Sequence, residues 1–244
     1  MKDTLVIIVN GAGTTGAELT GLHKFLSKKS NYFAYYPHNI PGGFVGDYFP
    51  KSRIADFNRF IDETIDMMRH PFKHIYVIGY SLGAATASVI ASRTNRVDKL
   101  VLVAPIVKNP SFRKFFRGFV SNYQKKESLS KVQKLFFREF VRRFQYVPKS
   151  HIWVLQRYFR YTKKFVKHIK NTDILIIETL QDEIVKPKSI DWLLKRLDAR
   201  HVERYAIDSS HFLFFDRKAR KQAYAKIEGF LEEDSHESIS QLVE

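Results

Sequence analysis

The segment of residues 74–93 constrains the fold more than any other part of the chain. It begins with HIYVI, an apolar run with β-branched residues that is typical of a buried strand, and continues directly into GYSLG (Gly79–Gly83). The alanine-rich stretch that follows, Ala84–Arg93, is typical of a helix. A strand that passes so directly into a helix packs that helix against a sheet, so the segment predicts an α/β fold with Ser81 at the turn.

The other apolar runs repeat this alternation along the chain. We predict further strands at Thr4–Val9, Tyr32–Tyr36, Lys99–Val103, Asp173–Thr179 and Val202–Ile207, and helices at residues 52–70, Lys188–Leu197 and Asp216–Glu232. Ser52 is expected to cap the first of these helices. Strands that alternate with helices form a mostly parallel sheet flanked by helices on both faces, which is the architecture predicted here.

One interval between predicted strands is too long for a simple crossover connection. It separates the strand that ends at Val103 from the strand that begins at Asp173. We interpret residues 105–170 as an inserted helical cap. The chain is then divided into a core of residues 1–104 and 171–232, the cap, and a polar tail at residues 233–244 that is expected to be frayed.

Composition excludes several classes of protein. The chain has no cysteine, so it cannot form disulfides, thiolate metal sites or a cysteine nucleophile. Its longest apolar run near the start, Leu5–Val9, is too short for a signal peptide or a membrane-spanning helix. We therefore expect a cytoplasmic protein, and the basic insertion described below would allow it a peripheral position at a membrane surface.

The turn at Ser81 has the features that activate a serine hydroxyl. A hydroxyl is a weak nucleophile, so it must be exposed and placed beside a base. A sharp strand-to-helix turn exposes it and strains its backbone, and the positions two before and two after must be small, as Gly79 and Gly83 are. The helix that follows also directs the backbone N–H of Leu82 towards a developing oxyanion. Ser81 is therefore the candidate nucleophile.

The partners of such a serine follow it in the order acid, then histidine. Asp182 comes just after the strand that ends at Thr179, and His211 comes just after the strand that ends at Ile207. Because the carboxyl ends of parallel strands meet at one edge of a sheet, these residues are expected to lie beside Ser81. Asp182 is therefore the candidate acid and His211 the candidate base.

Two neighbouring residues are weaker candidates. Glu183 is the nearest alternative acid, and we interpret it as a solvated neighbour. His201 precedes its predicted strand, which places it at the opposite edge of the sheet. Of the nine histidines, His211 alone has the position that the base requires.

The net charge of +16 is confined to the insertion. Residues 108–170 contain 18 Lys and Arg residues against two acids, whereas bases and acids cancel in the rest of the chain. This distribution indicates a neutral core with a basic insertion, not a protein that is basic throughout. On a helix its apolar and basic residues would occupy different faces, with Val132, Phe136, Phe140 and Phe144 on one and Lys131, Lys134, Arg138 and Arg142 largely elsewhere.

Two interpretations of this basic insertion remain open. In the first, its apolar face packs over the predicted site while its charges stay in water. In the second, the positive face also attracts an anionic partner, either a phospholipid surface or an acidic substrate such as an acyl-CoA. A nucleic-acid partner is disfavoured, because a helical face explains the spacing of the aromatic residues better than base stacking does.

A resemblance to a known family extends over nearly the whole chain apart from the insertion. Its segments are Val6–Gly16 (VIIVNGAGTTG), Gly79–Gly83, Asp182–Val185 (DEIV) and Ser209–Phe212 (SSHF). These segments are similar to motifs of the α/β-hydrolase superfamily, in particular of its small capped carboxylesterases and monoglyceride-lipase-like members. The resemblance implies an α/β-hydrolase fold whose helical cap enters where the insertion lies.

The resemblance also implies a mechanism and a second oxyanion donor. It assigns Ser81, Asp182 and His211 to a catalytic triad that transfers an acyl group to water. The backbone N–H of Ala12 would join that of Leu82 in holding the oxyanion; the family usually has His-Gly before this position, where this chain has Asn10-Gly11. The expected substrate is a lipid-like carboxylic ester, and the reaction requires no cofactor or metal.

Other functions are compatible with parts of this pattern. A thioesterase acting on acyl-CoA, a peptidase or an acyltransferase could use the same residues, and a non-catalytic relic that binds anionic membranes is the alternative from a different class. The turn Gly11-x-Gly13-x-x-Gly16 also matches a dinucleotide-binding fingerprint. That chemistry needs an acidic residue at the end of the second strand, where this chain has Tyr36-Pro37, so no cofactor is expected.

Overall fold

A parallel sheet forms the centre of the molecule. The computed structural model describes residues 2–13, 16–37, 40–45, 48–107, 131–144 and 146–233. The strands in these residues are all parallel to their neighbours and lie in the order β2-β1-β3-β4-β5-β6. They are β1 (Thr4–Val9), β2 (Tyr32–Tyr35), β3 (His74–Tyr80), β4 (Lys99–Val103), β5 (Asp173–Thr179) and β6 (His201–Ile207). The predicted fold class is confirmed.

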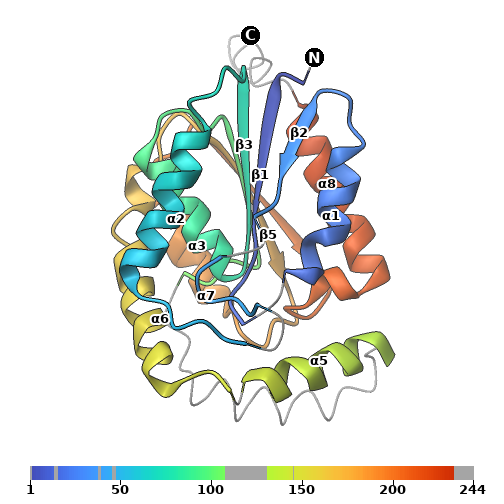
Figure 1. The fold of residues 1–244 in the computed structure, drawn as a ribbon. Helices are drawn as coiled ribbons and strands as arrows, with labels where there is room; N and C mark the ends of the chain where they lie inside the picture. Colours follow the sequence, from blue (N-terminus) through green and yellow to red (C-terminus); the bar gives the residue numbers. More distant parts are fainter. Residues whose placement is uncertain are drawn as a thin grey trace.

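Helices cover both faces of this sheet, as Figure 1 shows. Alternate residues of β1 point into two separate cores. Leu5 and Ile7 pack on the side of α2 (Ile54–Met67), α3 (Leu82–Arg93) and α7 (Pro187–Leu194). Val6 and Ile8 pack on the side of α1 (Thr20–Ser27) and α8 (Arg217–Glu232). Burial on both faces explains why the central strands β1, β3, β4 and β5 are nearly continuous apolar runs in the sequence, whereas the edge strands β2 and β6 are only partly buried. Short 3₁₀ helices complete the core: η1 (Ala17–Leu19), η2 (Val166–His168) and η3 (Leu213–Phe215).

The described part of the interval between β4 and β5 includes two α-helices of 14 residues each, α5 (Lys131–Phe144) and α6 (Lys149–Thr162). In Figure 1, α5 crosses the end of the molecule at which the strands finish, whereas α6 runs along the side that carries α2 and α3. Among the described residues, no helix is both long and apolar enough to cross a membrane.

Several predictions for the insertion and the tail lie outside the described residues. The structure does not describe residues 108–130 of the insertion or residues 234–244 of the tail. The structure also leaves undescribed the side chains of the predicted apolar face of α5, which are Val132, Phe136, Phe140 and Phe144. That apolar face therefore stays a prediction. The basic side chains of α5 are described, and Lys131, Lys134, Arg138 and Arg142 are all exposed.

The predicted cap of the helix after residue 52 is wrong, and the reason is a contact with a distant loop. The helix begins at Ile54, and the Ser52 hydroxyl instead accepts the backbone N–H of Gly42 at 3.2 Å. The orphan N–H at the start of the helix is satisfied by Asp56, whose carboxylate accepts from the backbone N–H of Arg53 at 2.6 Å.

Other boundaries differ by one to three residues. β3 continues through Tyr80 and α3 begins at Leu82, so the strand passes into the helix through Ser81 alone. α7 occupies Pro187–Leu194, with the proline at its first turn, where a missing N–H costs nothing. His201 is the first residue of β6, not the residue before it, and it remains at the amino end of that strand.

Candidate active site

The backbone at Ser81 is strained. Its φ is 57° and its ψ is −118°, a conformation that residues with a Cβ rarely adopt. The glycines on either side make the turn possible. A Cβ on Gly79 would come within 2.5 Å of the Gly83 carbonyl oxygen, and a Cβ on Gly83 would overlap the carbonyl oxygens of Val9 and Asn10. The tight packing of α3 against β1 therefore fixes Ser81 at the carboxyl edge of the sheet.

Two hydrogen bonds join Ser81, His211 and Asp182 into one chain. His211 Nε2 lies 2.9 Å from Ser81 Oγ, and His211 Nδ1 lies 2.9 Å from Asp182 Oδ2. The three side chains come from the loops after β3, β5 and β6, so the parallel sheet brings them together from positions 130 residues apart. The expectation that the turn exposes the serine is wrong: Ser81 is 6% exposed, because the loop at Gly11 lies against its side chain. His211 is 2% exposed, so both hydrogen bonds are shielded from water.

The Asp182 carboxylate is held on both of its oxygens. Its Oδ1 accepts the backbone N–H groups of Ile184 at 2.8 Å and Val185 at 2.7 Å. Its Oδ2, which faces His211, also accepts the Thr179 hydroxyl. The two backbone donors fix the rotation of the carboxylate, so that one oxygen is always presented to the imidazole.

The backbone of His211 is also anchored on both sides. Its N–H donates to Glu183 Oε2 at 3.2 Å, and its carbonyl accepts the Tyr80 hydroxyl at 2.9 Å. Glu183, interpreted from the sequence as a solvated neighbour, is partly exposed, and its carboxylate also anchors the backbone of the histidine. The Tyr80 ring stacks beside the imidazole at 5.5 Å, and burial raises the pKa of its hydroxyl well above the usual range, so it remains a donor. The sequence gives no sign of these roles of Tyr80 and Glu183, except that Tyr80 is adjacent to Ser81 and Glu183 is adjacent to Asp182.

The loop after β1 lies directly against the serine. A Cβ on Gly11 would be 3.0 Å from the Ser81 Cβ and 3.4 Å from Ser81 Oγ, so glycine is what permits this approach. The loop is tied to a second one by the Gly13 N–H, which donates to the Gly42 carbonyl at 2.8 Å. Leu82 is the first residue of α3, where backbone N–H groups have no partner within the helix. The two predicted oxyanion residues, Ala12 and Leu82, thus flank Ser81.

Helix α6 packs over this region. Its Leu155, Tyr158 and Phe159 form an apolar cluster with Phe57 and Leu82, and Ala12 packs against the same cluster. The Tyr158 ring stacks on Phe57 at 4.0 Å, and its hydroxyl bonds to Thr86 in α3 at 2.9 Å. The inserted segment therefore contributes apolar side chains to the surroundings of both predicted oxyanion residues.

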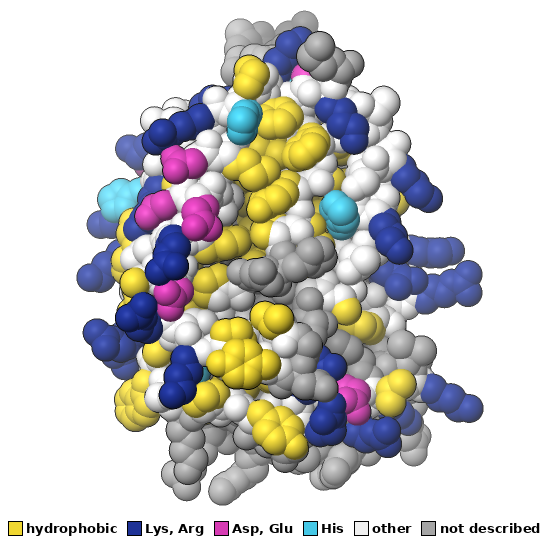
Figure 2. Space-filling view, viewed as in Figure 1, with side chains coloured by type: hydrophobic (Ala, Val, Ile, Leu, Met, Phe, Trp, Pro, Cys, Tyr) yellow, Lys and Arg dark blue, Asp and Glu magenta, His cyan; other side chains and the backbone are white. Residues whose placement is uncertain are grey.

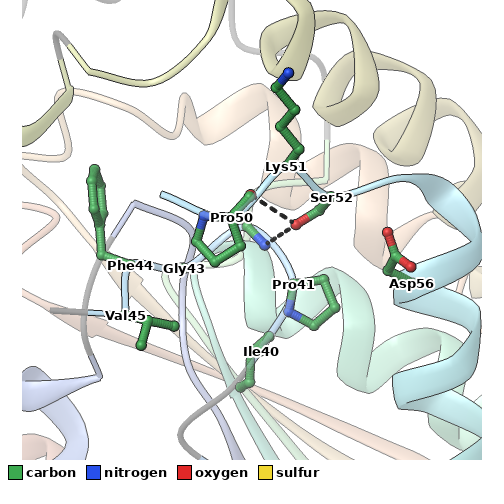
Figure 3. A pocket seen from close by; sticks show the side chains of 10 residues that line it. Ile40, Pro41, Gly43, Phe44, Val45, Pro50, Lys51, Ser52 and Asp56 are labelled. Atoms are coloured by element: carbon green, nitrogen blue, oxygen red, sulfur yellow. Dashed lines mark hydrogen bonds between the residues drawn. The ribbon is translucent and has the colours of Figure 1, made fainter. Parts of the chain in front are cut away.

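A cavity of about 220 Å³ lies beside the loop that supports Gly13. Figure 3 shows its wall, in which the Ser52 hydroxyl joins the backbone at Pro50 and Gly42 while the Lys51 side chain extends away. The lining is mostly apolar: Ile40, Pro41, Gly42, Gly43, Phe44, Val45, Pro50, Lys51, Ser52 and Asp56. None of these residues belongs to the hydrogen-bonded chain of Ser81, His211 and Asp182.

Gly42 also contacts a buried histidine of α6. A Cβ on Gly42 would lie 3.7 Å from His151 Nε2, and the ring of Phe49 packs edge-on against the imidazole at 4.6 Å. His151 is 3% exposed, and within the described residues neither of its ring nitrogens has a hydrogen-bond partner. Burial therefore favours the neutral ring and lowers the pKa of His151 to about 4.

This histidine should make the folded protein sensitive to mild acid. The pKa of His151 is lower in the folded state than its ordinary value of 6.5, so below pH 6.5 the unfolded state binds more protons. The free energy of unfolding should then decrease as the pH falls from 6.5 to 4, by on the order of 3 kcal/mol in total. Urea unfolding at pH 7 and at pH 4.5 measures this loss.

The matched comparison uses one buried and one exposed histidine. His151→Leu should unfold with a weaker dependence on pH across this window, because the apolar replacement removes the titrating group. His168→Leu, at an exposed position, should keep the dependence of the unmodified protein. If His151→Leu loses stability on acidification as steeply as the unmodified protein does, another group is responsible.

Comparison with known families identifies the fold. The family model described as "alpha/beta hydrolase fold" matches residues 4–141, which is more than half of the chain. The chain belongs to the α/β-hydrolase family. No curated protein matches its sequence.

Solved structures with the same fold include lipases and esterases. A structure from work on the metagenome-derived lipolytic enzymes LipS and LipT has a TM-score of 0.72 at 13% identity, covering 94% of this chain and 93% of its own. The monoacylglycerol lipase of Paleococcus ferrophilus has a TM-score of 0.66 at 16% identity and covers 93% of both chains. A soluble variant of the monoglyceride lipase of Saccharomyces cerevisiae has a TM-score of 0.66 at 12% identity, and the match covers 94% of this chain and 86% of its own. At such identities the likeness shows the fold alone.

Proposed function

We propose that this protein is a serine hydrolase that cleaves carboxylic esters. The observation that carries the proposal is the hydrogen-bonded chain from Ser81 through His211 to Asp182 on a strained strand-to-helix turn. A nucleophile, a base and an orienting acid in this geometry are what acyl transfer to water requires.

In the first half of the reaction, Ser81 Oγ attacks the ester carbonyl and His211 Nε2 takes its proton. The imidazole can accept that proton when Nδ1 carries the other one and donates it to Asp182 Oδ2. Collapse of the tetrahedral intermediate breaks the ester bond, and His211 returns the proton to the departing alcohol. The acyl group is left on Ser81 Oγ.

In the second half, water attacks the acyl-serine by the same route. His211 takes a proton from the water, the carbonyl carbon becomes tetrahedral again, and the acid leaves as Ser81 recovers its proton. In both halves the carbonyl oxygen carries negative charge, which the backbone N–H groups of Ala12 and Leu82 would stabilise by hydrogen bonds. Neither half calls for a metal or a cofactor.

We propose a lipid-like acyl ester as the substrate class and the inserted segment as a cap over the site. The support for the cap is the apolar cluster through which Leu155, Tyr158 and Phe159 of α6 pack beside both predicted oxyanion residues. These side chains are buried, so they hold the insertion against the site and do not themselves form a wall for an acyl chain. The described lipolytic and monoglyceride-lipase neighbours have names consistent with that class.

A probe and a substrate panel test the proposal together. A fluorophosphonate should label the folded protein, because only an activated serine reacts with it. In a panel of p-nitrophenyl esters, kcat/KM should rise with chain length by up to about fourfold per methylene group, the value expected for apolar burial. Absence of labelling would end the proposal. A clear preference for acyl-CoA over esters of the same chain length would replace it with a thioesterase.

A further inference from the structure

Helices α5 and α6 expose a surface that combines positive charge with large apolar side chains. On α5, Lys131, Lys134, Arg138 and Arg142 are exposed and recur at intervals of three or four residues, so they form one stripe. On α6, Trp153, Arg157 and Arg160 form a second exposed stripe at the same spacing. We call the two stripes, together with Leu135 and Tyr146, the basic-aromatic face.

Most charges of this face have no ion-pair partner within the described part of the chain. Glu139 is the only acid in the sequence from residue 131 to residue 170, and it bonds to Arg142 at 2.9 Å. Among the described residues, no carboxylate pairs with Lys134, Arg138 or Arg157. Like charges gathered without counter-charges cost free energy through mutual repulsion, which an anionic partner would relieve.

The apolar side chains of the face are unusually exposed. Trp153 is 67% exposed, Tyr146 is 61% exposed and Leu135 is 55% exposed. These residues lie on α5, on the connection that follows it and on the first turns of α6. In Figure 2, apolar and basic side chains alternate along the end of the molecule that Figure 1 assigns to these elements. Tryptophan and tyrosine beside lysine and arginine are the combination that settles at the boundary between lipid headgroups and acyl chains.

We propose that the basic-aromatic face docks this protein on an anionic phospholipid surface. The bases would bind lipid phosphates while Trp153, Tyr146 and Leu135 enter the headgroup layer. A single-stranded nucleic acid would satisfy the charges and could stack on the aromatic rings, but it offers nothing to an exposed leucine. The proposal adds a partner to the function proposed above and is tested without relying on it.

Vesicle sedimentation of the full-length Ser81→Ala protein tests docking, because binding is then measured without any turnover. The protein should sediment with vesicles of phosphatidylcholine and phosphatidylglycerol and not with phosphatidylcholine alone. Binding should weaken steeply between 50 and 500 mM salt, since the screening length falls over this range. A protein that does not prefer acidic lipid at low salt refutes the proposal.

A pair of charge-reversal variants tests which face is used. The triple variant Lys134→Glu, Arg138→Glu, Arg142→Glu should reduce partitioning to anionic vesicles at least about 100-fold. Each basic residue near such a surface contributes to the free energy of binding, and each reversal replaces that attraction by repulsion. The control reverses Lys2, Lys28 and Lys167, which are exposed near the amino ends of the strands, and should bind normally. Thermal unfolding checks that both variants are folded. Equal binding by the two variants contradicts the assignment.

Tryptophan fluorescence tests the apolar half of the face. The chain has two tryptophans, and Trp192 is partly covered by Arg196, whose guanidinium lies 4.4 Å from its ring centroid. In a Trp192→Phe background, Trp153 is the only tryptophan, and tryptophan emission should shift to the blue on anionic vesicles. An unshifted spectrum for vesicle-bound protein rules out insertion of this face.

Two other results would replace the lipid partner by another one. In the first, excess polyuridylate binds the protein and anionic vesicles do not, which indicates a nucleic-acid surface. In the second, vesicles fail to bind but the triple variant raises KM for an acyl-CoA without changing KM for a small soluble ester, which indicates an acidic substrate. Each of these results overturns the proposal, whatever the outcome of the fluorophosphonate test.

Discussion

Replacing Ser81 with alanine is expected to reduce ester hydrolysis by at least about 10⁴-fold, because the reaction then loses the atom that carries the acyl group. The His211 imidazole would keep its bond to Asp182 but would have no hydroxyl to deprotonate. Fluorophosphonate labelling should disappear at the same time. Steady-state kinetics on a p-nitrophenyl ester, with labelling followed on a gel, measures both losses.

A glycine variant separates the chemical role of Ser81 from its backbone strain. Ser81→Ala keeps a Cβ at φ 57°, whereas Ser81→Gly removes both the hydroxyl and the strain. Both variants should be inactive. The free energy of unfolding should be larger for Ser81→Gly than for Ser81→Ala by roughly 1 kcal/mol, so Ser81→Gly should unfold at a higher temperature. Residual labelling of a folded Ser81→Ala protein would place the nucleophile at another residue.

The features that the sequence predicts well are those that depend on periodicity and chain order. A strand buried on both faces is a short apolar run whatever its surroundings, so the central strands are recognisable from their own residues. The edge strand β6 is partly exposed and contains charged residues, so its own pattern is weaker. Ser81 follows a buried apolar run directly, and Asp182 and His211 each come within four residues of the end of a strand. Once the strands are parallel, their position at one edge of the sheet is a consequence of topology and needs no knowledge of side-chain packing.

The features that the sequence does not predict are contacts between segments that are distant along the chain. Ser52 has the pattern of a helix cap, yet its hydroxyl accepts a hydrogen bond from a backbone N–H ten residues earlier in the chain. Lys99 is 2% exposed because its ammonium group donates to the carbonyls of Phe230 and Leu231 at the end of α8, which a strand position gives no reason to expect. His151 is buried beside Gly42 only because α6 packs there.

The assignment of the acid shows the same limit at close range. Asp182 and Glu183 are adjacent, and the sequence alone gives only a preference between them. The structure separates them by contact: Asp182 accepts from the ring of His211, whereas Glu183 accepts from its backbone. This difference predicts opposite results for two substitutions that each replace one carboxylate by its amide.

Asp182→Asn should remain folded and lose about 10⁴-fold in kcat, the scale known for loss of the orienting carboxylate in such triads. The backbone N–H groups of Ile184 and Val185 require an acceptor, so the amide oxygen should turn towards them. The amide NH₂ then faces His211 Nδ1 and donates to it. The imidazole must carry its proton on Nε2, where it can no longer accept the proton of Ser81.

Glu183→Gln should leave kcat within about threefold of normal, because the glutamine oxygen can still accept the backbone N–H of His211 and a net bond of this kind contributes roughly 1 kcal/mol. Kinetics of the two variants on one soluble ester, with thermal unfolding to confirm that both are folded, makes the comparison. If Glu183→Gln is the variant that loses orders of magnitude while Asp182→Asn stays active, the acid of this site is one residue further along the chain than the geometry assigns it.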